Sequence, residues 1–75
     1  METAYREQYI HFGSKVQYYR KLMRLTQEAS ADEIGKPWSF VAKIESPTRP
    51  FGVSMETLFK IAEVLNVPVS KLFED

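Results

Sequence analysis

The chain has 75 residues, a formal net charge of zero, no cysteine and one histidine. This length suffices for one small domain with a limited core, the lack of cysteine excludes a disulfide framework and a zinc–thiolate site, and His11 alone cannot hold a metal ion. No apolar run could span a bilayer and the N-terminus lacks the features of a signal peptide, so we expect one cytoplasmic domain over residues 1–75, with no membrane contact, metal or cofactor.

A stripe of aromatic and apolar residues predicts a long first helix. The stripe recurs at spacings of three and four residues, which is one face of a helix that begins near the first of them. Its members are Tyr5, Tyr9, Phe12, Val16, Tyr19 and Met23. Gly13 weakens this helix without forbidding it. The alternative is a frayed N-terminus whose aromatic side chains merely rest on the domain.

Two short helical patterns separated by a single turn come next. Thr26 is the expected N-cap of the first, because its side chain can accept a hydrogen bond from a free N–H, and the pattern ends near Ile34. Gly35 suits the left-handed conformation after that helix, and Pro37 suits the first turn of a second helix that ends at Glu45. The positions that face a common core are Ala31, Ile34, Val41 and Ile44. Those that point outward from the second helix are Trp38, Ser39, Ala42 and Lys43.

The last third of the chain predicts a loop and two further helices. Two prolines and a glycine make residues 46–53 a loop. Ser54 is the expected N-cap of a helix that ends at Asn66, and Pro68 starts a short last helix. The core stripe of the longer helix is Met55, Leu58, Ile61, Ala62 and Leu65. The short helix offers more apolar surface than a terminal turn needs, on Val69, Leu72 and Phe73.

Two sequence blocks resemble the helix-turn-helix proteins of the phage repressor and Cro type, the XRE family. The first is LTQEASADEIGKPWSFVAKIE, residues 25–45, and the second, METLFKIAEVLNVPVSKLF, is similar to that family's last two helices. The resemblance implies an all-α, compact five-helix domain of the lambda-repressor type with its helix-turn-helix at residues 26–45. Because the family's first helix starts near Gly13, residues 1–12 are then an N-terminal helical extension.

Two departures from the family pattern are visible. Ser30 takes a position where the family usually has leucine. The loop after Glu45 is about two residues longer than usual, with Pro47 in place of glycine. Both departures bear on local packing and on the path of the loop.

The resemblance implies that the protein binds double-stranded DNA sequence-specifically as a transcriptional regulator, expected to be a repressor, with the helix at 37–45 in the major groove. Lys43 and Ser39 lie one turn apart, where lysine can donate to guanine and serine can donate or accept at a base edge. Trp38 would touch a thymine methyl group or a sugar; alternatively, it folds back over Ser30 and fills the missing leucine volume. The expected contacts to the DNA backbone are Gln27, Lys36, Thr48, Arg49 and Lys15. Each of these five is otherwise an ordinary solvated side chain or a neighbour of a cap.

A net charge of zero is unusual for a DNA-binding domain, but the charge is segregated along this chain. Residues 1–24 carry a net +3, residues 25–34 a net −3, residues 35–49 a net +2 and the remainder a net −2. A folded domain can therefore present a basic face made from the first helix, the outward face of the helix at 37–45 and the loop after it.

The family implies a structural salt bridge, and the small size of the domain and the short readout of one recognition helix suggest a dimer. An arginine and a glutamate at the positions of Arg20 and Glu45 pair in the family, because a guanidinium and a carboxylate can form two parallel hydrogen bonds. We expect a homodimer on a palindromic operator, since one recognition helix reads only a few base pairs. The expected interface is Val69, Leu72 and Phe73, with Tyr5 and Tyr9 as a second contact.

Other functional classes compete with this interpretation. An antitoxin, or another protein-interaction module that binds its own operator, would use the aromatic N-terminal segment to hold a protein partner such as a toxin. A restriction-modification controller protein is a further alternative, and a neighbouring gene for a toxin or a restriction enzyme would distinguish these cases. An enzyme is poorly supported, because one histidine, no cysteine and no glycine-rich phosphate loop leave no catalytic residues to name.

Overall fold

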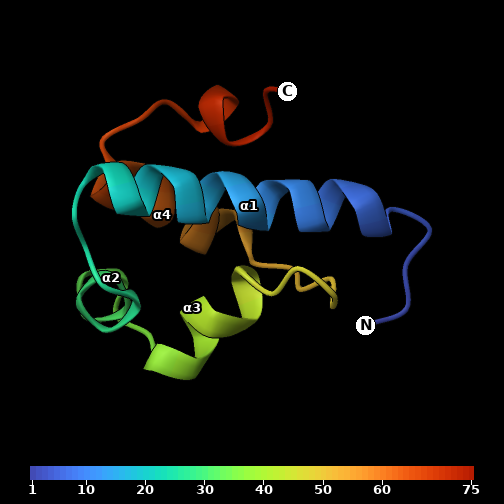
Figure 1. The fold of residues 1–75 in the computed structure, drawn as a ribbon, viewed down its shortest axis with the longest axis horizontal. Coiled ribbons are helices and arrows are strands. Elements are labelled where there is room, and N and C mark those ends of the chain that lie inside the picture. Colours follow the sequence, from blue (N-terminus) through green and yellow to red (C-terminus); the bar gives the residue numbers. More distant parts are fainter.

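The computed structural model describes residues 1–75 as four α-helices and one short 3-10 helix, with no strand (Figure 1). The elements are α1 (Arg6–Leu22), α2 (Gln27–Ile34), α3 (Trp38–Ile44), α4 (Met55–Leu65) and η1 (Val69–Leu72). The expected all-α architecture is confirmed, with one correction: the fifth helix is a 3-10 helix rather than an α-helix. None of the helices has the length and apolarity that crossing a membrane requires.

The long helix α1 organises the arrangement of the others. Figure 1 shows α1 crossing the whole molecule, with α2 and α3 to one side of it and the C-terminal segment to the other. It contacts α3, α4 and η1, while α2 packs on α3 and α4. The N-terminus lies on the same side as the yellow loop that joins α3 to α4.

The expected helix ends form by local hydrogen bonds and backbone conformations. The Thr26 hydroxyl accepts a hydrogen bond from the Ala29 N–H at 3.0 Å, and Ser54 caps α4 in the same way. Gly35 ends α2 with φ of +82°, and Asn66 ends α4 with φ of +57°, both in the left-handed region. Pro37 is the N-cap of α3 rather than part of its first turn.

Helix α1 runs without a break through Gly13, which has no room for a side chain. A Cβ built at this position would overlap the carbonyl oxygen of Ile44, because the C-terminal end of α3 lies directly against α1 there. The glycine that weakens the helix by itself therefore allows two helix backbones to touch. Tyr5 and Met23, at the ends of the expected stripe, are 63% and 44% exposed, so only the middle of the stripe is buried.

The Gly13→Ala variant is expected to destabilise the protein, although alanine favours a helix by about 1 kcal/mol over glycine. Overlap with the Ile44 carbonyl must push α3 away from α1, and overpacking of this kind costs about 1–3 kcal/mol. Urea unfolding measures the difference. Gly35→Ala is a useful comparison, because nothing lies within 4 Å of a Cβ there and only the left-handed backbone opposes the substitution.

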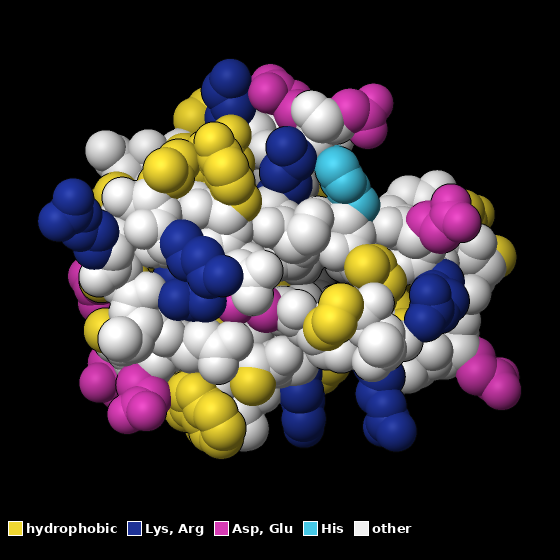
Figure 2. Space-filling view, viewed as in Figure 1, with side chains coloured by type: hydrophobic (Ala, Val, Ile, Leu, Met, Phe, Trp, Pro, Cys, Tyr) yellow, Lys and Arg dark blue, Asp and Glu magenta, His cyan; other side chains and the backbone are white.

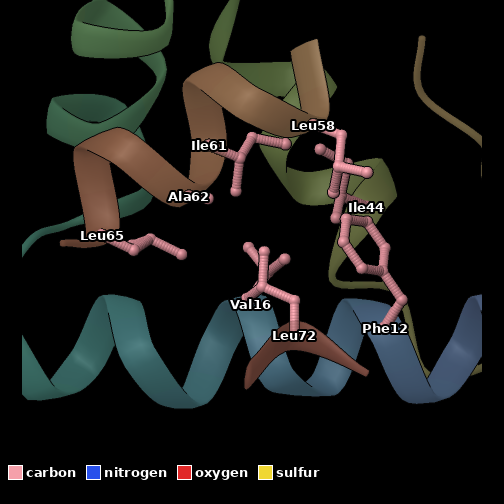
Figure 3. Close-up of a cluster of buried hydrophobic side chains, with 8 residues drawn as sticks. All are labelled: Phe12, Val16, Ile44, Leu58, Ile61, Ala62, Leu65 and Leu72. Atoms are coloured by element: carbon pink, nitrogen blue, oxygen red, sulfur yellow. The ribbon is translucent and has the colours of Figure 1, made fainter. Parts of the chain in front are cut away.

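The hydrophobic core lies between α1, α4 and η1, and Figure 3 shows its side chains converging from these elements and from α3. The cluster comprises Phe12, Val16, Ile44, Leu58, Ile61, Ala62, Leu65 and Leu72. The core stripe expected in α4 is present except at Met55, which is 63% exposed. Met55 is the first residue of α4, at the exposed N-terminal end of the helix.

Leu72 corrects the expected dimer interface. Its side chain is fully buried, at 0% exposure, within the core of this single chain, so it is not available at the centre of a contact between two chains. The tight 3-10 turn directs Leu72 inward and leaves the next residue, Phe73, 53% exposed. The Phe73 ring stacks on Phe12 with 5.4 Å between ring centroids. Val69 is partly buried against the same cluster.

Candidate functional site

The outward face of α3 carries the three residues expected to contact bases. Trp38, Ser39 and Lys43 are exposed, whereas Val41 and Ile44 on the opposite face are buried. The 3.6-residue period of the helix produces this division, since positions 39 and 43 are one turn apart. Trp38 is 55% exposed and shares a hollow with Ser39, so its indole lies on the outward face. Ser30 is buried, and its hydroxyl donates to the carbonyl of Gln27 at 2.9 Å.

A hollow of about 460 Å³ borders this face and joins α3 to the loop that follows. It is lined by Met1, Trp38, Ser39, Ala42, Lys43, Ser46, Arg49, Pro50 and Phe51. Figure 2 shows basic side chains projecting from the edge of the molecule where α3 and its loop lie, and acidic side chains towards the end of the molecule occupied by α2. The sign of the surface charge therefore changes between the two helices of the helix-turn-helix.

Two aromatic rings position two of the lysines. Phe40 and Phe51 pack edge to face with 5.3 Å between their centroids. The Lys36 Nζ lies 5.2 Å from the Phe40 centroid, and the Lys43 Nζ lies 5.9 Å from the Phe51 centroid. Each ammonium is attracted to the face of its ring, so the aromatic pair holds a lysine of the turn and a lysine of α3 beside the same surface.

The loop after α3 carries Thr48 and Arg49, both exposed. Ser46 organises its first turn, because its hydroxyl accepts a hydrogen bond from the Arg49 N–H at 3.2 Å and lies 3.4 Å from the Thr48 hydroxyl. The Thr48 carbonyl accepts a hydrogen bond from Arg6 on α1. Arg49 lines the hollow together with Lys43, so the loop extends the basic edge of α3.

A buried ion pair joins α1 to the end of α3, the helix that carries the site. The Arg20 Nε and Nη2 atoms donate to the two carboxylate oxygens of Glu45 at 2.7 and 2.9 Å, which is the expected bidentate pair. The third donor group, Nη1, reaches the Leu25 carbonyl at 2.7 Å. Hydrogen bonding to Glu45 raises the pKa of Arg20 above its usual value, against the smaller opposing effect of burial.

Gln27 joins this network. Its amide nitrogen donates to a Glu45 carboxylate oxygen at 3.0 Å, so the start of α2 is tied to the end of α3. This bond takes up part of the hydrogen-bonding capacity that a phosphate contact would use. One amide N–H, the amide oxygen and the free N–H groups at the start of α2 are left for other partners.

The structure brings four of the eight expected DNA-contacting residues together in the hollow, whereas Gln27, Lys36, Thr48 and Lys15 lie outside it. The hollow is lined by Trp38, Ser39, Lys43 and Arg49. Lys36 lies over the ring of Phe40, which packs on Phe51 in the lining of the hollow. Lys15 is half-buried on α1, with its Nζ 5.9 Å from the Tyr18 centroid, and it does not line the hollow. Ala42, expected to point outward from this helix, also lines the hollow, and the lining residues that the sequence did not single out are Met1, Ser46, Pro50 and Phe51. Phe51, an aromatic residue two places after Arg49, was the only feature of the sequence that could have indicated an aromatic contribution of this loop to the hollow.

Comparisons with known proteins agree with this geometry. A helix-turn-helix family model matches residues 16–72. Two curated relatives, uncharacterized HTH-type transcriptional regulators from Sinorhizobium medicae and Rhizobium meliloti, are each 36% identical over 66 residues, or 88% of this chain. The match covers 46% of each relative, so the chain spans about half the length of the curated relatives it matches.

Two solved structures share the fold. The restriction-modification controller protein C.AhdI from Aeromonas hydrophila is similar with a TM-score of 0.79 and 28% identity, covering 89% of this chain and 98% of that one. SinR, described as the master regulator for biofilm formation and solved in complex with DNA, has a TM-score of 0.75 and 27% identity, covering 84% and 98%. These likenesses confirm the fold expected from the two sequence blocks.

Proposed function

Because the chain belongs to the helix-turn-helix family of the Cro/C1 repressor type, the XRE family, we propose that it is a transcriptional regulator that binds double-stranded DNA with α3 in the major groove. The observation that carries this proposal is the outward face of α3, where Ser39 and Lys43 are exposed one turn apart beside the exposed Arg49. A helix presented in this way fits the major groove, which is wide enough to admit an α-helix.

The base contacts belong to the outward face of α3. The Lys43 ammonium donates to guanine O6 or N7, and the Ser39 hydroxyl donates or accepts at a neighbouring base edge. Trp38 offers a flat apolar surface at the start of α3, which suits a thymine methyl group or a deoxyribose. These three residues set the sequence preference.

The phosphate contacts flank that face on both sides. Arg49 and Thr48 reach the backbone from the loop after α3, and Lys36 reaches it from the turn before α3. Gln27 contributes through the free N–H groups at the start of α2, because its side chain already donates to Glu45. Lys15, on α1 and outside the hollow, adds charge at longer range.

Two alanine variants separate base contacts from phosphate contacts. Lys43→Ala is expected to weaken the best duplex by about 1–3 kcal/mol and to relax the preference at one base pair. Arg49→Ala is expected to weaken all duplexes alike and to lower the slope of log affinity against log salt by about 1. The best duplex is first selected from a random pool, and affinities for it and for a scrambled duplex are then measured over a salt series.

The wild-type protein decides the proposal itself in the same assay. Specific binding should exceed binding to the scrambled duplex and should fall steeply with salt. An affinity that depends on neither sequence nor salt would exclude the DNA-binding function. Equal losses on both duplexes for Lys43→Ala would instead move Lys43 to the phosphate contacts.

A homodimer is the assembly that we propose on the operator. One copy of α3 reads too few base pairs to specify a genomic site, and two copies related by a two-fold axis double the readout. Phe73 is the exposed apolar residue of the C-terminal segment, and it lines a groove together with Tyr5 and Tyr9. Phe73 and the two tyrosines line the same groove, and this is the interface that we propose; Leu72 is buried, and Val69 does not line the groove.

A restriction-modification controller is a second candidate, favoured by the likeness to C.AhdI. In that case the operator would lie upstream of this gene and of a neighbouring restriction or methylation gene. Mapping the bound site by footprinting on the surrounding genomic DNA tests this directly, and an operator with no such neighbour excludes it.

A further inference from the structure

The peptide group that joins Thr48 to Arg49 is held from both sides. On one side the Arg49 N–H donates to the Ser46 hydroxyl at 3.2 Å. On the other side the Thr48 carbonyl accepts a hydrogen bond from the Arg6 guanidinium, with 2.5 Å between Nη2 and the oxygen. Since the N–H and the carbonyl belong to one planar unit, these two bonds together fix the orientation of the backbone that precedes the Arg49 side chain.

The two bonds differ in origin. The bond from Ser46 is local, because it spans three residues within the turn. Arg6 is 42 residues away in the sequence and lies in the first turn of α1. Nearby, Tyr9 and Met1 face Gly52, where a Cβ would lie 3.3 Å from a ring carbon of Tyr9. The N-terminal segment therefore supports the loop at two points.

The second half of the loop is anchored by Phe51, which packs on Phe40, and by Val53, which lies against the core cluster. Its first half, which carries Thr48 and Arg49, is exposed from residue 47 to residue 49. Residues 46–53 form no helix or strand, and the Thr48 and Arg49 N–H groups bond only to the Ser46 hydroxyl within the turn. The bond from Arg6 is the hydrogen bond that reaches this half of the loop from a distant part of the chain. A flexible loop must be ordered before it can bind, which lowers affinity. The matched family segment begins at residue 16, so the residues that supply the support lie before it.

We propose that Arg6 is a positioning residue for DNA binding: its guanidinium fixes the Thr48–Arg49 peptide and so directs the Arg49 side chain towards the DNA backbone. This inference rests on the proposed function. Arg6 itself acts through the loop and does not touch the phosphates. The N-terminal part of α1 thus contributes to DNA affinity by ordering a loop that belongs to another part of the chain.

A double-mutant cycle distinguishes this role from a direct phosphate contact. Arg6→Ala is expected to weaken binding to every duplex by about 3- to 10-fold, because the net contribution of one hydrogen bond has this size. The slope of log affinity against log salt should fall by up to about 1. In an Arg49→Ala background the same Arg6→Ala substitution should change affinity less than 2-fold and leave the salt slope unchanged, because the contact that Arg6 positions is already absent.

Lys21→Ala is the matched control, because it removes one exposed positive charge from the opposite end of α1. Its effect on affinity should be small and equal in the wild-type and Arg49→Ala backgrounds. Circular dichroism and the thermal midpoint are recorded for every variant. Helical signal and midpoint should stay close to wild type in Arg6→Ala, since the Arg6–Thr48 hydrogen bond is exposed.

Three results would overturn the inference. Additive losses for Arg6→Ala and Arg49→Ala would make Arg6 a direct phosphate contact. An Arg6→Ala affinity equal to wild type would show that the loop needs no support. Loss of the folded state in Arg6→Ala would assign Arg6 to stability instead. If the wild-type protein shows no specific, salt-dependent binding, the proposed function fails first, and that result is separate from all three.

Discussion

Replacing Arg20 with alanine is expected to lower the free energy of unfolding by about 3–5 kcal/mol, because it leaves a buried charge without its partner. The Glu45 side chain is 1% exposed and accepts two hydrogen bonds from Arg20, so only the bond from Gln27 would remain. The Leu25 carbonyl, in the turn before α2, would lose a donor as well. Urea unfolding followed by circular dichroism measures the loss.

The partner variant and an exposed pair provide the controls. Glu45→Ala should be similarly destabilising, and the double variant should lose less than the sum of the two single losses, because the second substitution removes a group already left unpaired. Lys60 pairs with Glu63 at 3.0 Å on the surface, and Lys60→Ala should cost at most about 0.5 kcal/mol. Strictly additive losses for Arg20 and Glu45 would show that the two side chains do not stabilise each other.

The Leu72→Ala substitution is expected to lower the free energy of unfolding by about 2–5 kcal/mol, since it leaves a cavity in the centre of the core. Leu72 is fully buried against the side chains of α1 and α4, and a chain of 75 residues has a small margin of stability. Thermal and urea unfolding of the variant measure this loss. A stability equal to wild type would contradict the buried position of Leu72.

A substitution at the neighbouring residue, Phe73, is expected to leave the fold intact. Phe73→Asp changes a side chain that is 53% exposed, so the fold should persist by circular dichroism. Under the dimer proposal, sedimentation should shift from dimer to monomer, and binding to a duplex with two half-sites should weaken strongly while binding to one half-site changes little. A wild-type protein that sediments as a monomer and binds one half-site equally tightly would exclude the dimer.

Among the residues expected at the DNA surface, positions that depend on helical period could be predicted from the sequence, whereas contacts between distant residues could not. The outward position of Ser39 and Lys43 follows from helical periodicity once Val41 and Ile44 are assigned to the core. The Arg20–Glu45 pair came from the family resemblance, since nothing in the spacing of 25 residues indicates it. Gln27 was expected to contact a phosphate because it lies at the start of a helix. Its hydrogen bond to Glu45 at the end of α3 was not predicted, since only the fold brings these two residues together.

The helix boundaries and the outward face of α3 were determined by the sequence itself. Thr26, Gly35, Ser54 and Asn66 act within three or four residues of their own position, so local hydrogen bonds and backbone preferences suffice. These features would be the same in many tertiary settings.

Only the tertiary structure decided which apolar residues are buried near the ends of the helices and in the C-terminal segment, and which distant groups meet. Leu72 is buried and Phe73 is exposed although both are apolar and adjacent, because burial depends on what stands opposite each side chain. Gly13 is needed because the end of α3 crosses α1 at that residue, and Arg6 meets Thr48 because the N-terminus of α1 lies beside the loop after α3. Contacts between elements far apart in the chain have no period in the sequence, and packing of the whole domain determines them.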